Sequence, residues 1–465
     1  SVQAWCGTCP PKLGLYGPPP AMNDMGTSAA NLIAEQTRTG SDRPAAGGAP
    51  LYTHNADADQ RLHGIFQEIG GRVADRLPTP PAAVLLTGSF ARGEGSILRD
   101  KDRLQVLSDM EFIVVSSRGT DINRAQQFLD EEAHNTGKYL ARQGIECEVE
   151  FNSVHRDYLN RVHPAIFSYE LMAHARTVWG DARILTAARR FPISAIPRWD
   201  AWRLLNNRLL EQLQWAEISA RWEVRDLRAA FYHVLKCYLD MATVILIFAG
   251  HYRSRYGERA AALETWARAA TREDAPFAED LAERVAACTT FKLRPDFGVR
   301  PLGVDLSAEP ERLSGEVRRA IAELIRMFHL VWRWAGNAFI GTTGRPVNDD
   351  LALQNAVMRT QPRREKLRGW AKLALMPEVR RRPDFFSRMG RLLLKGSPRY
   401  LIYTVASNLC FRLPEVLNGM TPELTDQEEL LPVTFVHEPV ADSAWWRLRD
   451  DVLSGWRLFL RNHWA

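Results

Sequence analysis

The chain has 465 residues, of which 46% are hydrophobic and 25% are charged. These values are typical of an ordinary globular protein, and the length predicts two or three domains. No uninterrupted apolar run approaches the ~20 residues that a membrane-spanning helix needs, so we expect no transmembrane span. The nearest run, Met241 to Ala249, is interpreted as a buried core helix.

The cysteines point to a reducing compartment. Six of them are scattered along the chain, and the N-terminus lacks a charged-then-apolar signal pattern. We therefore expect reduced thiols and a cytoplasmic protein. Cys6 and Cys9 form a Cys-x-x-Cys pair, but no second pair accompanies it in the sequence to complete a four-ligand zinc site.

In chain order, the first segment is residues 1–50, where Pro, Gly, Ala and Ser without apolar periodicity predict disorder. From Asp57 to Leu77, apolar residues recur at helical spacing and predict a helix. An apolar strand at Val84 to Leu86 then breaks into Gly88-Ser89. The stretch from Arg99 to Arg103 is charged and turn-like, which predicts a loop or a hairpin.

A second apolar strand, Phe112 to Val115, follows directly after Asp109-Met110-Glu111. Successive side chains of a strand point to opposite faces, so Asp109 and Glu111 project on the same side. Two adjacent carboxylates repel each other unless a cation lies between them, and hard divalent ions such as Mg²⁺ favour oxygen ligands. The earlier Gly-Ser turn can offer N–H groups and a hydroxyl to a phosphate. Together these features indicate metal-assisted phosphoryl or nucleotidyl transfer.

A helix and a third strand come next. The helix is predicted from Asp121 to Arg142, with a buried side made of Ala125, Phe128, Leu129, Ala133 and Leu140. The strand is predicted from Gly144 to Val154, with apolar residues on one face and three carboxylates, Glu146, Glu148 and Glu150, on the other. The order strand, strand, helix, strand suits a small mixed sheet with helices on one face.

This pattern resembles the polymerase-β-type nucleotidyltransferases, whose mark is Gly-Ser after the first strand and Asp-x-Asp or Asp-x-Glu at the start of the next. The resemblance implies that Asp109, Glu111 and Glu150 are catalytic and hold two Mg²⁺ ions, or Mn²⁺, with Glu148 as the alternative third ligand. It also implies that Gly88, Ser89 and Arg92 bind the phosphates of an NTP such as ATP. Solvation in a loop is the competing interpretation for Arg92.

Two departures from the family pattern are visible. The chain has Asp-x-Glu instead of the commoner Asp-x-Asp, and the run between Ser89 and Asp109 is longer than expected. Both leave the metal chemistry intact, but they leave the subfamily unidentified.

From about Pro197 onward the sequence predicts almost only helices. Their expected ranges are Trp202–Trp222, Glu223–Phe248, Glu279–Ala287, Ser314–Phe339, Arg363–Leu375, Asp384–Lys395 and Ser443–His463. The predicted class is therefore α+β, with a small mixed β-sheet nucleotidyltransferase domain at residues 51–196. A helical domain at residues 197–345 and a basic helical region at residues 346–465 follow.

The most apolar helix carries a lysine, Lys236, and an unpaired buried ammonium is costly. Lys236 resembles the helical-domain lysine that reaches the triphosphate in many of these enzymes, and Tyr252 would then stack near the nucleotide. The alternative is an ion pair between Lys236 and Asp240, four residues along the same helix.

The segment from Arg359 to Arg399 contains thirteen basic residues and only three acidic ones. Such a density attracts an anionic partner, which the sequence leaves open between a nucleic-acid acceptor and an anionic membrane surface. The remaining interpretation is that these side chains are the solvated faces of packed helices.

The sequence predicts an Mg²⁺-dependent enzyme that transfers a nucleoside monophosphate from an NTP to a hydroxyl acceptor and releases pyrophosphate. The acceptor is left open between a small molecule, a nucleotide, an RNA end and a protein side chain. The alternatives are an inactive member of the fold that binds nucleotide or assembles with partners, and a peripheral membrane protein that acts through its basic helices.

Overall fold

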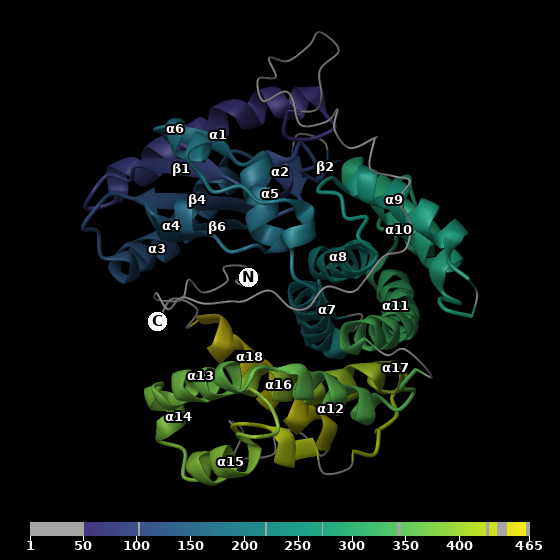
Figure 1. Ribbon diagram of the computed structural model, residues 1–465. Helices are drawn as coiled ribbons and strands as arrows, with labels where there is room; N and C mark the ends of the chain where they lie inside the picture. The colour runs from purple at the N-terminus through teal and green to yellow at the C-terminus, as the bar shows by residue number, and fades with distance from the viewer. Residues whose placement is uncertain are drawn as a thin grey trace, which may run out of the picture.

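The computed structural model confirms the α+β class. It describes residues 51–100, 103–218, 221–271, 273–341, 346–424, 427–434 and 444–461. Two small sheets occupy the N-terminal part and helices form the rest (Figure 1). The segment predicted to be disordered, residues 1–50, and its Cys-x-x-Cys pair lie outside the described residues.

The main sheet has four strands in the order β6-β4-β1-β7. They are β1 (Ala83–Leu86), β4 (Met110–Ser116), β6 (Val149–His155) and β7 (Arg176–Gly180). β4 runs antiparallel to β1 and parallel to β6, while β7 runs antiparallel to β1. The sheet is therefore mixed, and the parallel pair brings the N-terminal ends of β4 and β6 to the same edge.

A second sheet contains β2 (Ile97–Asp100), β3 (Arg103–Val106) and β5 (Ile145–Glu146). β2 and β3 form the hairpin that the charged stretch predicted. The prediction of one strand from Gly144 to Val154 is wrong, because β5 pairs with β3 while β6 pairs with β4. The chain changes sheets at Cys147 and Glu148.

Helices cover both faces of the main sheet, so the prediction of helices on one face is wrong. α1 (Ala56–Arg76) and α3 (Ile122–Arg142) share one apolar cluster with the sheet. The short helices α4 (Tyr158–Arg161), α5 (Ile166–His174) and α6 (Arg183–Thr186) cover the other face. Phe128, expected on the buried side of α3, is 39% exposed.

The helical part begins with α7 (Arg198–Leu213) and continues to the C-terminal end of the described chain. Its other helices are α8 (Val224–Phe248), α9 (Tyr256–Ala269), α10 (Ala278–Leu293), α11 (Pro310–Ile340), α12 (Asp350–Thr360), α13 (Arg363–Ala374), α14 (Pro377–Arg380), α15 (Phe385–Leu392), α16 (Pro398–Phe411), α17 (Leu413–Leu417) and α18 (Ala444–Arg461). The predicted helix to Trp222 ends earlier, because α7 passes into a 3₁₀ turn at Gln214.

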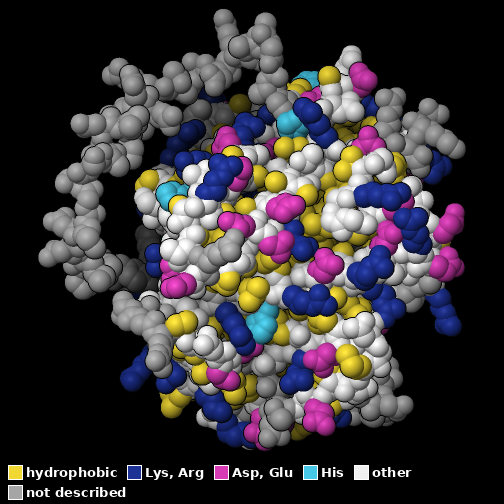
Figure 2. Space-filling view, turned by 90° about the vertical axis from the view of Figure 1, so that its right-hand side faces the viewer, with side chains coloured by type: hydrophobic (Ala, Val, Ile, Leu, Met, Phe, Trp, Pro, Cys, Tyr) yellow, Lys and Arg dark blue, Asp and Glu magenta, His cyan; other side chains and the backbone are white. Residues whose placement is uncertain are grey.

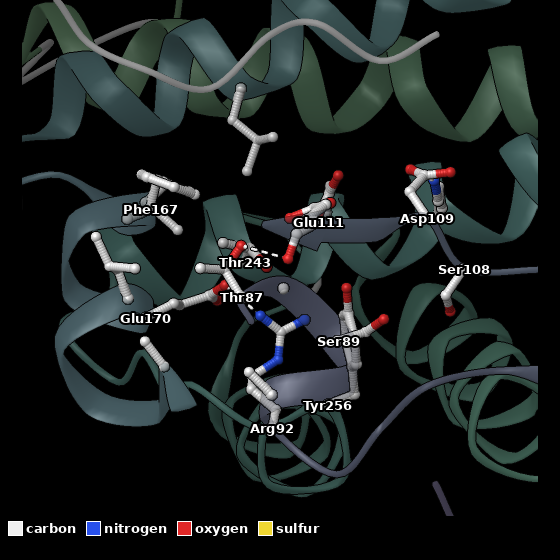
Figure 3. Close-up of a pocket in the computed structure, with 18 of the residues that line it drawn as sticks. Thr87, Ser89, Arg92, Ser108, Asp109, Glu111, Phe167, Glu170, Thr243 and Tyr256 are labelled. Carbon is white, nitrogen blue, oxygen red and sulfur yellow. Dashed lines mark hydrogen bonds and ion pairs between the residues drawn. The ribbon is translucent and has the colours of Figure 1, made fainter. Parts of the chain in front are cut away.

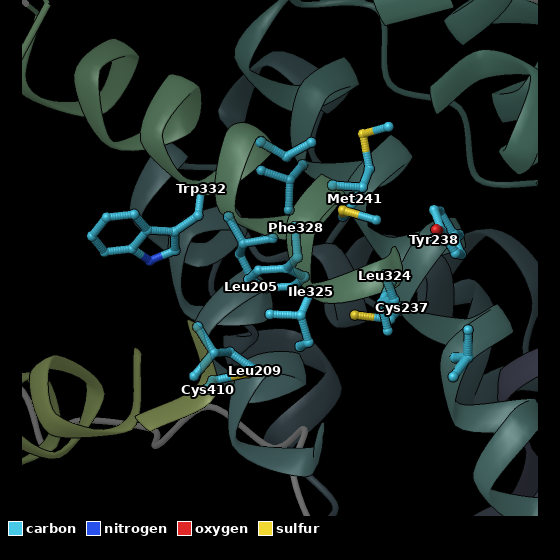
Figure 4. Close-up of a cluster of buried hydrophobic side chains, with 14 of the residues drawn as sticks. Leu205, Leu209, Cys237, Tyr238, Met241, Leu324, Ile325, Phe328, Trp332 and Cys410 are labelled. Carbon is cyan, nitrogen blue, oxygen red and sulfur yellow. The ribbon is translucent and has the colours of Figure 1, made fainter. Parts of the chain in front are cut away.

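One apolar core joins the helices before and after residue 345. Leu205 of α7, Met241 of α8 and Phe328 of α11 meet Cys410 of α16 in the same buried cluster (Figure 4). Trp332, Trp445 and Trp456 are buried in this core. A second, smaller cluster lies between α13, α15 and α16.

α8 runs through the centre of the helical part, and its apolar stretch is buried by its neighbours. It is the one helix of the described chain that is long and apolar enough to cross a membrane, but 89% of that apolar window is buried inside the protein. Met241 to Ala249 is therefore part of a core helix. On the face that carries α9, α10 and α11, basic and acidic side chains are interspersed (Figure 2).

Candidate active site

Three carboxylates meet at the edge of the sheet where β4 and β6 begin. Glu111 of β4 lies directly opposite Glu150 of β6 in the parallel pairing. Asp109 precedes β4 by one residue, and alternation along the strand places its side chain on the side of Glu111. All three line one pocket of about 150 Å³, which lies between the sheet and the helices (Figure 3).

Burial and mutual repulsion raise the pKa values of two of these carboxylates. Burial raises the pKa of Glu111 to about 7, and the charge of Asp109 adds to this effect. Burial raises the pKa of Glu150 to about 8, with a further contribution from Glu111. Asn152 donates a hydrogen bond to Glu150 Oε1 over 3.1 Å.

Gly88 and Ser89 begin α2 (Gly88–Ala91), a single helical turn directly after β1. Gly88 has a φ of +65°, and a Cβ atom there would lie 2.6 Å from Glu111 Oε2. A glycine is therefore required for both conformation and space. Ser89 is 8% exposed and lines the pocket beside Glu111. The structure thus brings the Gly-Ser pair and the acidic pair together.

Lys236 of α8 reaches across the pocket to the sheet. Its Nζ lies 3.0 Å from Asp109 Oδ2, and this ammonium holds the pKa of Asp109 below its ordinary value, although burial alone would raise it. The predicted alternative, a pair with Asp240, does not form, because Asp240 binds Arg208 of α7. Lys236 therefore occupies a position beside a carboxylate of the candidate metal site.

Lys292 of α10 is a second lysine of the same pocket, which sequence reasoning missed. It is 2% exposed, and its hydrogen-bond partners among the described residues are the hydroxyl groups of Ser108 at 2.7 Å and Tyr232 at 2.6 Å. Burial lowers the pKa of Lys292, and the charge of Lys236 lowers it further. The helical wall of the pocket thus carries two ammonium groups.

Arg92 faces the pocket but is held by carboxylates. Its guanidinium binds Glu94 at 3.2 Å and Glu170 at 2.5 Å. Glu170 also binds Arg259, and Tyr252 donates a hydrogen bond to it over 2.5 Å. These groups form a closed ionic network between α2, α5 and α9.

This network changes the predictions for two residues. Arg92 lines the pocket, but it is paired with carboxylates and only 5% exposed, so the alternative of a solvated loop arginine is wrong. Its contact with phosphates stays a prediction. Tyr252 is fully buried behind the pocket and does not line it, so its predicted stacking on a nucleotide finds no support. Tyr256, one helical turn later, lines the pocket instead, and burial raises its pKa to about 12.

A second cavity of about 460 Å³ lies on the other side of the carboxylates, between α3 and β6. His134 and Lys138 line it from α3, and Glu148 lines it from the turn before β6. Asp109 and Glu150 line both cavities, whereas Glu148 lines only the outer one. The placement favours Glu150 over Glu148 as the third carboxylate.

The donor set fits a hard divalent ion in its chemistry. Asp109, Glu111 and Glu150 offer oxygen ligands, and burial together with neighbouring carboxylates raises the pKa values of Glu111 and Glu150. Within the described ranges, however, no three His, Cys, Asp or Glu side chains stand close enough to hold an ion as they are. One of these carboxylates, Asp109, is paired with Lys236.

The missed residues had weak signals in the sequence. Lys292 closes a helix of ordinary composition, and Glu170 lies in a short helix without amphipathic periodicity. Arg259 and Tyr256 begin α9, for which no helix was predicted. The only sequence feature that could have identified these residues as part of a site was an arginine or lysine among apolar neighbours.

Comparison of the chain with family models, curated proteins and solved structures finds no match. The resemblance to polymerase-β-type nucleotidyltransferases therefore rests on the residues of this chain alone.

Proposed function

We propose that the protein is an Mg²⁺-dependent nucleotidyltransferase that moves a nucleoside monophosphate from an NTP to a hydroxyl group and releases pyrophosphate. One observation carries this proposal. Glu111 and Glu150 face each other across the β4–β6 pair with raised pKa values, next to Asp109 and opposite two lysines.

The separation of charges across the pocket supports a metal–triphosphate substrate. The sheet side carries three carboxylates, which attract metal ions, and the helical side carries Lys236 and Lys292, which attract phosphates. A metal–NTP complex presents both kinds of charge at once. A purely cationic ligand would leave Lys292 without a partner of opposite charge.

Asp109, Glu111 and Glu150 would hold two Mg²⁺ or Mn²⁺ ions, which would neutralise the triphosphate and acidify the acceptor hydroxyl. Ser89 and Lys292 would bind the β- and γ-phosphates, and Lys236 would leave Asp109 to join them. The acceptor oxygen then attacks the α-phosphorus, the bond to the β-phosphate breaks, and pyrophosphate leaves.

Glu150 is the group placed to accept the proton of the acceptor hydroxyl. Its Oε1 receives the hydrogen bond from Asn152, which leaves Oε2 for the proton. The outer cavity beside Glu150 is where we place the acceptor, which would approach from the side opposite the lysines.

The test combines a binding measurement with a product search. Titration of Mn²⁺, followed by electron paramagnetic resonance with and without a non-hydrolysable NTP analogue, measures site occupancy without an acceptor. Mass spectrometry after incubation with all four NTPs, Mg²⁺ and a panel of acceptors identifies nucleotide products. We expect Asp109→Asn with Glu111→Gln to abolish both, and Lys292→Met to weaken analogue binding while Mn²⁺ binding persists.

Glu148→Gln is the matched control, because Glu148 is two residues from Glu150 but lines only the outer cavity. It should leave Mn²⁺ binding unchanged. Wild-type protein that binds neither Mn²⁺ nor the analogue would contradict the proposal, as would binding that the Asp109 and Glu111 substitutions leave intact.

A second candidate is nucleotide binding without turnover. The observation that favours it is the ion pair between Lys236 and Asp109, which engages a catalytic carboxylate. This candidate predicts analogue binding that survives Glu150→Gln and no pyrophosphate release with any acceptor. The proposed enzyme instead predicts that the wild type forms a nucleotide product and that Glu150→Gln does not.

A further inference from the structure

The most exposed apolar side chains of the described chain all lie in one region. Leu394 is 82% exposed, Leu375 is 80% exposed, and Leu367 and Phe386 are each 55% exposed. They belong to α13, to α15 and to the turns that follow them. These helices, with α14, lie in the lower helical lobe, where α13 is nearest to the sheet and α15 is at the far end (Figure 1).

The same region carries exposed cations. α13 buries Trp370 and Leu373 against the smaller apolar cluster, and its helical period turns Arg368 and Leu375 to the outside. Further exposed cations lie on α14, on α15 and in the turns after them, and they form no ion pair with another described residue. They are Arg380, Arg381, Arg391 and Lys395. We call this surface, residues 363–395, the basic helical face.

Basic residues outnumber acidic ones along this face by eleven to three, the acidic ones being Glu365, Glu378 and Asp384. Asp384 is bound to Arg388 at 2.5 Å, so it does not neutralise the exposed arginines. Burial lowers the pKa of Lys372, and the charges of Arg368 and Arg399 lower it further. The face therefore gains from an anionic partner, unlike the face of α9 to α11 with its mixture of both signs (Figure 2).

We propose that the basic helical face docks the protein on an anionic lipid bilayer. A nucleic acid would satisfy the arginines but would leave Leu375 and Leu394 in water. A second copy of the chain would cover the leucines but would bring two basic faces together. An anionic bilayer accepts both components, because leucine and phenylalanine enter the boundary of the acyl chains while arginines remain at the phosphates.

The test uses the full chain and vesicles of two compositions. Co-sedimentation with phosphatidylcholine vesicles is compared with co-sedimentation with vesicles that also contain phosphatidylglycerol. We expect binding only to the anionic vesicles, and a decrease as salt is raised. Leu375→Ser with Leu394→Ser should lower the partition coefficient at least about tenfold, because two side chains lose their apolar insertion.

The matched control is Leu330→Ser with Leu351→Ser. These leucines are 45% and 43% exposed on α11 and α12, outside the basic helical face, and should not affect partition. Arg380→Gln with Arg381→Gln should weaken binding to anionic vesicles. All these sites are exposed, so circular dichroism spectra and thermal midpoints should match those of the wild type.

Three results would overturn the proposal. The first is the absence of wild-type partition onto anionic vesicles. The second is partition that the Leu375 and Leu394 substitutions leave unchanged while single-stranded RNA competes with it, which identifies a nucleic-acid surface. The third is dimerisation in analytical ultracentrifugation that the same substitutions abolish, which identifies a second copy as the occupant. None of these outcomes depends on nucleotidyl transfer.

Discussion

Replacing Glu150 by glutamine should stabilise the metal-free protein while it removes function. Burial and Glu111 raise the pKa of Glu150 from 4.5 to about 8. The folded state therefore binds this proton more tightly than the unfolded state does. The contribution of this proton to the free energy of unfolding is fully present below about pH 4.5 and is lost as the pH rises through about 8.

The size of the effect follows from the pKa difference. Each pH unit between the folded and unfolded pKa values is worth about 1.4 kcal/mol, so ionised Glu150 costs the metal-free protein up to about 5 kcal/mol above pH 8. Relaxation of the site and its coupling to Glu111 reduce this value, and we expect a gain of about 2–5 kcal/mol for Glu150→Gln at about pH 9. At about pH 5, where Glu150 is already protonated, the variant should match the wild type.

The assay is denaturant unfolding in the presence of EDTA at these two pH values, followed by tryptophan fluorescence. Glu148→Gln is the control, because Glu148 is exposed and lies two residues from Glu150. Adding Mn²⁺ should stabilise the wild type and leave Glu150→Gln less affected. The reasoning fails if Glu150→Gln gains nothing at the higher pH, or gains equally at both.

Two further substitutions test the parts around Glu150. Gly88→Ala forces alanine into a positive φ and pushes a Cβ atom against Glu111. It should therefore lower the free energy of unfolding by more than the roughly 1–2 kcal/mol that the backbone conformation alone costs. It should also weaken Mn²⁺ binding. Gly119→Ala shares the positive φ but has open space around its Cβ, so an equal cost in denaturant unfolding would refute the steric argument. Lys236→Met removes the ammonium at 3.0 Å from Asp109 and should destabilise the protein by about 3–5 kcal/mol near neutral pH. That loss should shrink as the pH falls and Asp109 takes up a proton, and in a double-mutant cycle Asp109→Asn should remove most of it.

The sequence predicts local parts of this site well and non-local parts poorly. Asp109 and Glu111 are two residues apart, so strand alternation alone places them on one side. The choice between Glu148 and Glu150 depends on which residue lies opposite Glu111, and this register belongs to a strand pair that only the fold defines. The sheet change at Cys147 is non-local for the same reason, because β3 captures the first part of the expected strand.

The helical wall was harder to predict because its chemistry comes from scattered positions. Lys292 is separated from Ser108 by 184 residues, and no periodic pattern joins them. Glu170 closes an ion network with Arg92 and Arg259 across three elements, and its charge alone gave no indication of burial. By contrast, the main core helices were predicted because continuous apolar periodicity is visible within each of them.

The contacts between the sheet and the helices determine whether the protein can be separated into fragments. Ser96 donates a hydrogen bond to the carbonyl of Lys292, and Glu94 accepts one from the backbone of Tyr256. Excising residues 51–196 would keep all three carboxylates but remove both lysines that face them. In the fragment, the three carboxylates would repel one another at an edge of the sheet that is open to water. A design that transfers this pocket to another protein must therefore include α8 and α10 as well as the sheet.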